Sequence, residues 1–251
     1  MKQSELISYL DSYLQIGLFS PIDYSLNGLV VGSPEDRKVE KVAVAVDASL
    51  STFERAIEAG CTFLIVHHGL FWGAPIAITG PHYRRIKTLL ESNLALYAAH
   101  LPLDAHPEVG NNAQMAKRLG LEEIEPFVLF KGVNIGFKGR FSTPRSAQWV
   151  CDQLGFDDPV ILSLGKEKCT TVGIVSGGAS DELGVAIAED LDLYITGEIK
   201  HEAYHQAAEE PTTVIGGGHY NTEVYGVKAL GEHLSERFGL EVLFIEDPTG
   251  L

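Results

Sequence analysis

The chain has 251 residues, of which 45% are apolar, and it carries a formal net charge of −15 at pH 7. This length can hold one large domain or two of ordinary size, and the apolar share is sufficient for real cores. Phosphate binding needs clustered Lys and Arg, so the acidic balance argues against nucleic acid as the main partner. The longest apolar runs, such as Phe63 to Val66, are strand-sized and far shorter than a membrane span.

The N-terminal segment MKQSELISYLDSYL is polar and has helical spacing, without the apolar core of a signal peptide. The three cysteines, Cys61, Cys151 and Cys169, are odd in number and scattered along the chain. This usage predicts buried, reduced thiols and, together with the N-terminus, a cytoplasmic protein without membrane association.

Apolar strands alternate with helical patterns in the first half of the chain. Strands are predicted at residues 41–46, 62–66 and 94–99, and helices at about 51–59, 81–92 and 112–119. Buried strands that alternate with helices predict parallel βαβ units and an α/β fold.

The second half repeats this order. Strands are predicted at residues 171–175, 193–195 and 213–215, and helices at about 181–189, 199–209 and 223–238. Asp47 to His67 spans 20 residues, as does Ser176 to Thr196. We interpret the match as a weak internal duplication that gives two similar α/β domains, residues 1–128 and 129–251. The alternative is that any two α/β halves share such an order.

Ligands of open α/β sheets bind beyond the carboxyl ends of the strands. That rule selects five loops, which hold four of the nine histidines: Asp47 to Ser49, His67 to Gly69, His100 to Asp104, Ser176 to Gly178 and His219 to Glu223.

Each candidate also has a structural explanation. His67 and His68 could be hydrogen-bonded residues at a strand end, and Asp104 could form a turn. Glu223 could be the first residue of the last helix, where a negative charge is favourable.

Taken together, three histidines and two carboxylates form a mixed nitrogen and oxygen ligand set: His67, His68, Asp104, His219 and Glu223. One catalytic zinc takes three protein ligands and a water, so this set is too large for a single ion. It suits two divalent ions that activate a bridging water, with Asp104 or Glu223 shared between them. Nitrogen and oxygen ligands accept zinc, iron or manganese, so the metal stays open.

The chain resembles the Nif-three-like family, also called GTP cyclohydrolase type-two homologues. The resemblance rests on an ordered series of strings that spans nearly the whole chain: SLNGLVVG, VHHGLFW, HLPLD, SGGAS, TGEIKH and GGGHYNTE. It implies two α/β domains with a dinuclear metal site in the cleft between them, assembled as a toroidal homohexamer. The ligands that it implies are the same five residues.

The resemblance implies hydrolytic opening of a purine nucleotide ring, so we expect a metal-dependent hydrolase of a small nucleotide-like or phosphorylated substrate. Glu198 is a candidate catalytic proton shuttle, or alternatively a charge at the start of the next helix. His100 could form a hydrogen bond to one of the metal ligands without binding the metal itself. The turn Ser176-Gly177-Gly178 could hold a phosphate on its N–H groups, or be a tight turn only.

Two other functions stay open. The first is a metal-binding protein without turnover, which serves as a metal store, chaperone or hexameric scaffold. The second is a zinc protease, because the pentapeptide HEAYH, His201 to His205, matches H-E-x-x-H. A protease also needs a third ligand and a substrate groove, and the sequence offers no second motif of that kind.

Overall fold

The computed structural model describes residues 1–32 and 35–250, which divide into two compact units. Of the described residues, the first unit comprises 1–32, 35–109 and 227–247, and the second comprises 110–226 and 248–250. This division differs from the predicted boundary after residue 128. Residues 110–128 belong to the second unit. The last strand of the chain, at residues 241–244, pairs with residues 41–44 and so belongs to the first unit.

The first unit contains a five-stranded sheet in the order β1-β4-β3-β2-β11. Its strands are β1 (Gly28–Val31), β2 (Lys41–Asp47), β3 (Phe63–His68), β4 (Ala95–Ala98) and β11 (Glu241–Phe244). β2, β3, β4 and β11 run parallel, and β1 is an antiparallel edge. The parallel order predicted for the first half is therefore confirmed.

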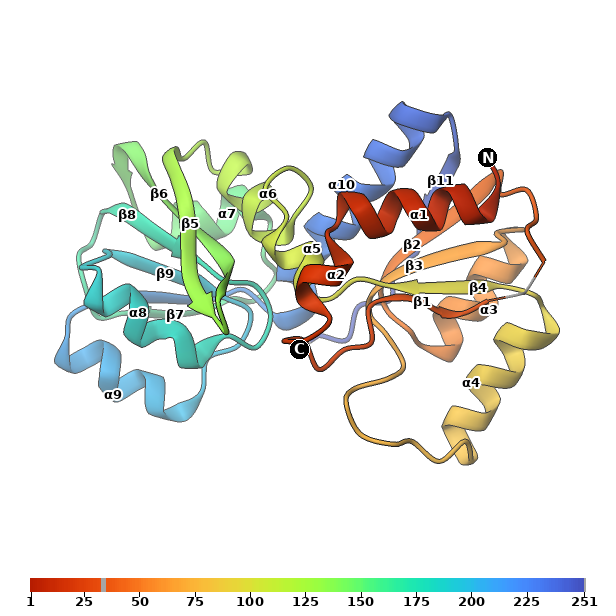
Figure 1. Ribbon diagram of the computed structural model, residues 1–251. Coiled ribbons are helices and arrows are strands. Elements are labelled where there is room, and N and C mark those ends of the chain that lie inside the picture. Colours follow the sequence, from red (N-terminus) through yellow and green to blue (C-terminus); the bar gives the residue numbers. More distant parts are fainter. Residues whose placement is uncertain (33–34, 251) are drawn as a thin grey trace. The chain divides into compact units, whose positions relative to one another are not determined.

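Helices cover both faces of this sheet, α3 and α4 on one face and α1 with the last turns of α10 on the other (Figure 1). The helices are α1 (Gln3–Tyr13), α2 (Ile16–Phe19), α3 (Leu50–Glu58), α4 (Gly80–Glu91), α5 (Leu101–Ala105) and α10 (His219–Phe238). Ser49 is the N-cap of α3, and its side chain accepts a hydrogen bond from the N–H of Thr52. Phe53 of α3 and Leu89 of α4 are buried in one core with Leu64 of β3.

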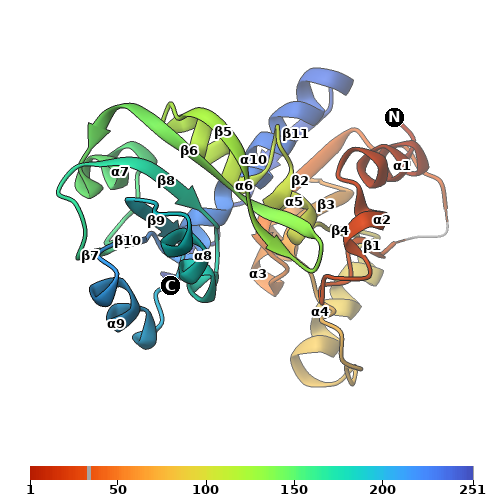
Figure 2. The same ribbon diagram turned by 60° about the vertical axis from the view of Figure 1, so that its left-hand side comes forward.

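The second unit contains a six-stranded sheet in the order β5-β6-β8-β9-β10-β7. Its strands are β5 (Glu122–Phe130), β6 (Val133–Arg145), β7 (Val160–Ser163), β8 (Cys169–Ile174), β9 (Leu193–Thr196) and β10 (Thr213–Gly216). β8, β9 and β10 run parallel, as predicted, and β5, β6 and β7 add antiparallel edges. The long β5–β6 hairpin is the green ribbon of Figure 2.

Four shorter helices cover the second sheet: α6 (Asn111–Arg118), α7 (Ala147–Leu154), α8 (Leu183–Ala188) and α9 (His201–Glu209). A short 3-10 helix, η1 (Ser180–Glu182), precedes α8. Met115 of α6 and Val150 of α7 are fully buried against Leu193 and Ile215 of the sheet. All three cysteines are buried free thiols, as predicted. No helix within the described residues is long and apolar enough to cross a membrane.

An aromatic stack joins α1 to α10 within the first unit. The hydroxyl of Tyr9 lies 2.5 Å from Nε2 of His233, and the ring of Tyr13 stacks on His233 with centroids 4.4 Å apart. Burial, followed by the positive charge of Arg237, holds the pKa of His233 below its ordinary value. The folded protein therefore opposes protonation of this ring.

Replacing His233 with Gln should make the free energy of unfolding less sensitive to acid. Because the folded-state pKa of His233 is depressed, its contribution is fully present above the unfolded pKa of about 6.5 and is lost as pH falls below it. Urea unfolding of metal-free protein between pH 7.5 and 5.5 measures the slope. The matched control is His205→Gln, at an exposed histidine of α9. Equal slopes for His233→Gln and wild type would contradict the assignment.

Candidate metal centre

Three histidines gather at the carboxyl ends of β3 and β4 in the first unit. His67 and His68 are the last two residues of β3, and His100 directly precedes α5. Ring centroids are 4.6 Å apart for His67 and His68 and 5.1 Å apart for His67 and His100. One ring nitrogen of each histidine lies within 4.8 Å of those of the other two, so the three rings can share one ion.

The ring orientations of His67 and His68 are set by hydrogen bonds to their Nδ1 atoms. Nδ1 of His67 lies 3.0 Å from the backbone oxygen of Ala99, and Nδ1 of His68 lies 2.8 Å from a carboxylate oxygen of Asp47. Both partners are acceptors, so each neutral ring carries its proton on Nδ1 and its lone pair on Nε2. A lone pair on Nε2 is what a divalent metal requires. Sequence reasoning placed Asp47 in a candidate loop but gave it no role.

His100 is held in the same way by Asp23, whose carboxylate oxygen lies 2.9 Å from Nδ1. The Asp23 side chain is only 1% exposed and also accepts from Asn27 and from the backbone N–H groups of Ser25 and Leu101. Burial opposes ionisation most strongly, but the hydrogen bonds and the His100 ring together bring the pKa of Asp23 below its ordinary value. Asp23 is therefore a carboxylate that anchors His100. His100 thus stands among the candidate ligands, where sequence reasoning had placed it behind them.

Asp104 lies beside His67, with Oδ2 of the carboxylate 3.6 Å from Nε2 of the ring, and both side chains are buried. The segment His100 to Asp104 was expected to be a loop. It is instead the start of α5, with Pro102 in its first turn. Proline is compatible with that position because the first N–H groups of a helix have no intrahelical partner. The helix turns the Asp104 carboxylate back towards the end of β3.

Trp72 forms an aromatic wall next to these rings. Its indole N–H donates to the backbone oxygen of Gly69 at 2.9 Å, and its ring meets His100 edge-on with centroids 4.9 Å apart. Sequence reasoning missed this residue, although it stands in the quoted string VHHGLFW.

In the second unit, His219 and Glu223 lie one turn apart on α10, and Nε2 of His219 is 3.3 Å from a carboxylate oxygen of Glu223. Glu223 was expected to begin this helix, but the helix begins at His219. Gly218, with φ of +91°, completes the turn after β10 and lets the helix start early. Glu223 is therefore a fifth helical residue paired with a histidine, and the explanation as a terminal charge is not supported.

Glu198 follows β9 and contacts His219 directly. A carboxylate oxygen of Glu198 lies 2.5 Å from Nδ1 of His219, which leaves Nε2 directed to the side of Glu223. Helix α9 begins only at His201, with Lys200 as the residue before it, so Glu198 lies outside the first turn of that helix. The geometry favours a role in orienting His219. The role of proton shuttle stays a prediction.

The turn Ser176-Gly177-Gly178 follows β8, and two of its N–H groups donate within the unit. The N–H of Ser176 donates to the side chain of Asn112 at 2.7 Å, and that of Gly177 donates to the hydroxyl of Thr222 at 3.0 Å. This pattern favours a structural turn over the predicted phosphate-binding loop.

Gly177 also permits a close approach to the ligand pair. Its φ is +67°, and a Cβ at this position would overlap Oε1 of Glu223 and lie 3.3 Å from Nε2 of His219. At Gly178 the nearest such atom is 3.7 Å away, which is ordinary contact. The turn therefore requires glycine at position 177 and tolerates a side chain at position 178.

The HEAYH motif lies on α9, where His201 and His205 are both exposed. Their ring centroids are 6.3 Å apart and the rings are nearly perpendicular. Within the described residues, neither histidine belongs to a group of His, Cys, Asp or Glu residues close enough to share an ion. The structure gives no support to a zinc protease.

Comparison with known proteins gives one consistent result. The sequence model of Duf34/NIF3 (NGG1p interacting factor 3) matches residues 1–249. A protein of Deinococcus radiodurans named GTP cyclohydrolase 1 type 2 homolog is 42% identical and aligns with 99% of this chain and 94% of its own length. A protein of the same name from Pyrococcus abyssi is 43% identical over the whole of both chains. The crystal structure of TTHA1606 from Thermus thermophilus superposes over the whole of both chains with a TM-score of 0.89 and 47% identity.

Replacing Gly177 with Ala should destabilise the protein and lower its metal content. The left-handed backbone and the contact with Glu223 are both unfavourable to a Cβ, and we expect a loss of more than about 1 kcal/mol in the free energy of unfolding. Urea unfolding and elemental analysis measure the two effects. The matched control is Gly178→Ala, for which a change within roughly 0.5 kcal/mol is expected. Equal behaviour of the two variants would show that Gly177 does not position the ligand pair.

Proposed function

The chain belongs to the Duf34/NIF3 family, and from this premise we propose that it is a dinuclear metal-dependent hydrolase of a small nucleotide-like or phosphorylated substrate. One observation carries the proposal. Three histidines converge at the end of one sheet, each with Nδ1 held by an acceptor so that Nε2 is left to bind a metal.

The donor chemistry of both units fits divalent ions. The first unit supplies His67, His68 and Asp104, with His100 next to them, and the second supplies His219 and Glu223. We propose that both sets bind the same pair of ions, with a carboxylate shared between them, because these six candidate ligands, His100 included, exceed what one catalytic ion takes. When bound, such ions supply Lewis acidity and lower the pKa of water. Zinc, iron and manganese are all compatible with imidazole and carboxylate ligands.

The side chains of this protein have two tasks in such a reaction. The acceptors on Nδ1, which are Asp47, Asp23 and Glu198 with the backbone of Ala99, orient the rings and keep a proton on Nδ1. The indole of Trp72 meets His100 edge-on and restricts the space on that side of the ring. Both effects preorganise the ligands before a substrate arrives.

The names of the relatives suggest where to search for a substrate. Proteins over 40% identical to this chain carry the name GTP cyclohydrolase 1 type 2 homolog. We therefore propose hydrolysis of a purine-like ring or a phosphoester as the first reaction classes to screen. A toroidal homohexamer is part of the same proposal, and light scattering that gives a monomer would refute it.

Elemental analysis of the purified chain should find about two divalent ions, a number that the ligand count supports. His67→Ala and His219→Ala should each lose metal, because each removes a ligand. His201→Ala is the matched control and should keep it, since His201 belongs to the exposed HEAYH motif. One ion, lost only in His201→Ala, would overturn the proposal.

A screen of nucleotides and phosphoesters then separates an enzyme from a metal store. Turnover that is lost with His67→Ala supports the hydrolase. Two bound ions that exchange freely, with no turnover on any member of the panel, would instead establish the non-catalytic metal-binding protein.

Glu198→Ala should weaken metal binding by about 10- to 100-fold, because His219 loses the acceptor that orients it. Glu198→Gln should recover part of that affinity, since the amide oxygen can accept from the same N–H. Competition with a chelator measures both variants, and Glu202→Ala at an exposed position of α9 is the control. If Glu198→Ala keeps the affinity of wild type and loses only turnover, Glu198 is a proton shuttle and not a positioning residue.

A further inference from the structure

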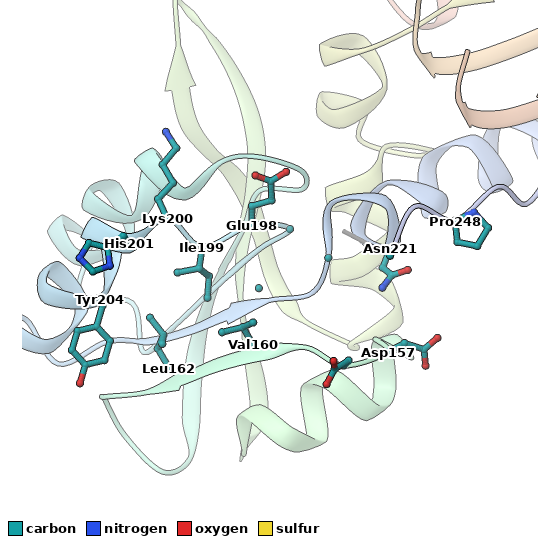
Figure 3. Close-up of a pocket in the computed structure, with 15 residues that line it drawn as sticks. Asp157, Val160, Leu162, Glu198, Ile199, Lys200, His201, Tyr204, Asn221 and Pro248 are labelled. Carbon is teal, nitrogen blue, oxygen red and sulfur yellow. The ribbon is translucent and has the colours of Figure 1, made fainter. Parts of the chain in front are cut away.

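The second unit contains a cavity of about 1000 Å³ at the carboxyl ends of β9 and β10. Figure 3 shows the side chains of Val160, Leu162 and Ile199 at its centre, with Tyr204 on one side and Asn221 on the other. Glu198, the partner of His219, also lines it. This is the position at which open α/β sheets bind their ligands. The lining includes residues of the strings TGEIKH and GGGHYNTE, and the roles given to those strings above do not include this cavity.

The apolar floor follows from the pairing of the edge strand β7 with β10. Val160 and Leu162 are two residues apart, so both side chains project from the same face of β7. Gly216 pairs with Val160 and contributes no side chain, and a Cβ there would lie 2.9 Å from Ile199. The result is an apolar surface bordered by an exposed tyrosine, 48% accessible, on α9. Such a surface suits a planar ring, because aliphatic and aromatic side chains can both pack against the face of the ring.

Carboxylate and amide acceptors stand around this floor, together with the side chains of Lys200, His201 and Tyr204. Asp157 and Asp158 are exposed carboxylates on the rim. Asn221 uses its amide N–H to bond the backbone oxygen of Gly217 at 3.2 Å, which leaves its side-chain oxygen as an acceptor towards the cavity. A ligand that matches this rim presents N–H donors.

Phosphate groups find little to bind in the same cavity. Among the described lining residues, Lys200 is the one lysine or arginine, and its ammonium group is held by Asp181 at 2.6 Å. Its backbone N–H, at the start of α9, donates to Ser180. Phosphate sites use several cationic groups or available N–H donors, and the carboxylates of the rim repel anions.

We infer that this cavity binds a planar heteroaromatic ring with amino or imino N–H groups, of the purine nucleoside class, and that it does not bind phosphates. The inference deepens the proposed function and rests on it in one respect, because the ring would lie beside Glu198 and hence near His219. The protein would then recognise its substrate through the ring and not through phosphate groups.

Calorimetric titration of the full-length protein with guanosine tests the inference, with inorganic triphosphate as the competitor. Val160→Trp fills the floor and should weaken guanosine binding at least tenfold, and Tyr204→Ala should weaken it about tenfold through lost stacking. Leu129→Trp is the matched control, since Leu129 is an exposed strand residue of the same sheet outside the cavity. It should bind guanosine as wild type does. Tyr204→Ala keeps the test valid if Val160→Trp fails to fold.

Three results would overturn the inference: no guanosine binding by wild type, equal binding by Tyr204→Ala and wild type, or displacement of guanosine by triphosphate. Because binding is measured without turnover, the result is distinct from that of the metal and substrate experiments. If guanosine binding depends on Tyr204 in a protein that shows no turnover, the inference about the cavity is supported and the proposed hydrolase function is contradicted.

Discussion

The candidate metal centre depends on hydrogen bonds to Nδ1 of its histidines. An imidazole has two nitrogens, and it binds a metal through one only when the proton resides on the other. Here backbone and carboxylate acceptors hold the proton at Nδ1 of His67, His68, His100 and His219. Each of these bonds forms within one unit, so each unit prepares its own ligands before any ion is bound.

The two units reach this result with different residues. In the first, two carboxylates and a carbonyl stand behind three rings, and Asp23 is kept ionised by the donors that surround it. In the second, Glu198 stands behind one ring, and Gly177 allows a neighbouring turn to approach the Glu223 carboxylate. Glu198 also lines the cavity for which we propose a heteroaromatic ligand, so the proposed ligand would lie next to the carboxylate that orients His219.

Sequence patterns were sufficient to predict the parallel cores, and they selected candidate ligands whose role in binding a metal stays a prediction. Apolar, β-branched runs predicted the carboxyl ends of β2, β3, β4, β8, β9 and β10 to within two residues, and the candidate ligands lie at or just after the ends of β3, β4 and β10. Patterns could not predict Asp23, because its bond to His100 joins residues 77 apart in the chain. They also missed the β5–β6 hairpin and the start of α10, which depend on turns at Gly132 and Gly218. They missed the edge strands β7 and β11 because the partners of these strands are distant in sequence. The cavity beside β7 was missed for the same reason, because an edge strand that was not predicted forms its floor.

The pairing of β11 with β2 has a consequence for synthesis on the ribosome. β11 is the last strand of the chain, at Glu241–Phe244, and it completes the sheet whose other strands are made first. Until residue 244 has emerged, β2 presents an open edge of unpaired backbone groups, which is a site for wrong association. The second sheet lies within residues 122–216 and can close earlier. The half of the protein that is translated first is therefore the half that finishes folding last, and truncation near the C-terminus would damage the sheet that carries His67 and His68.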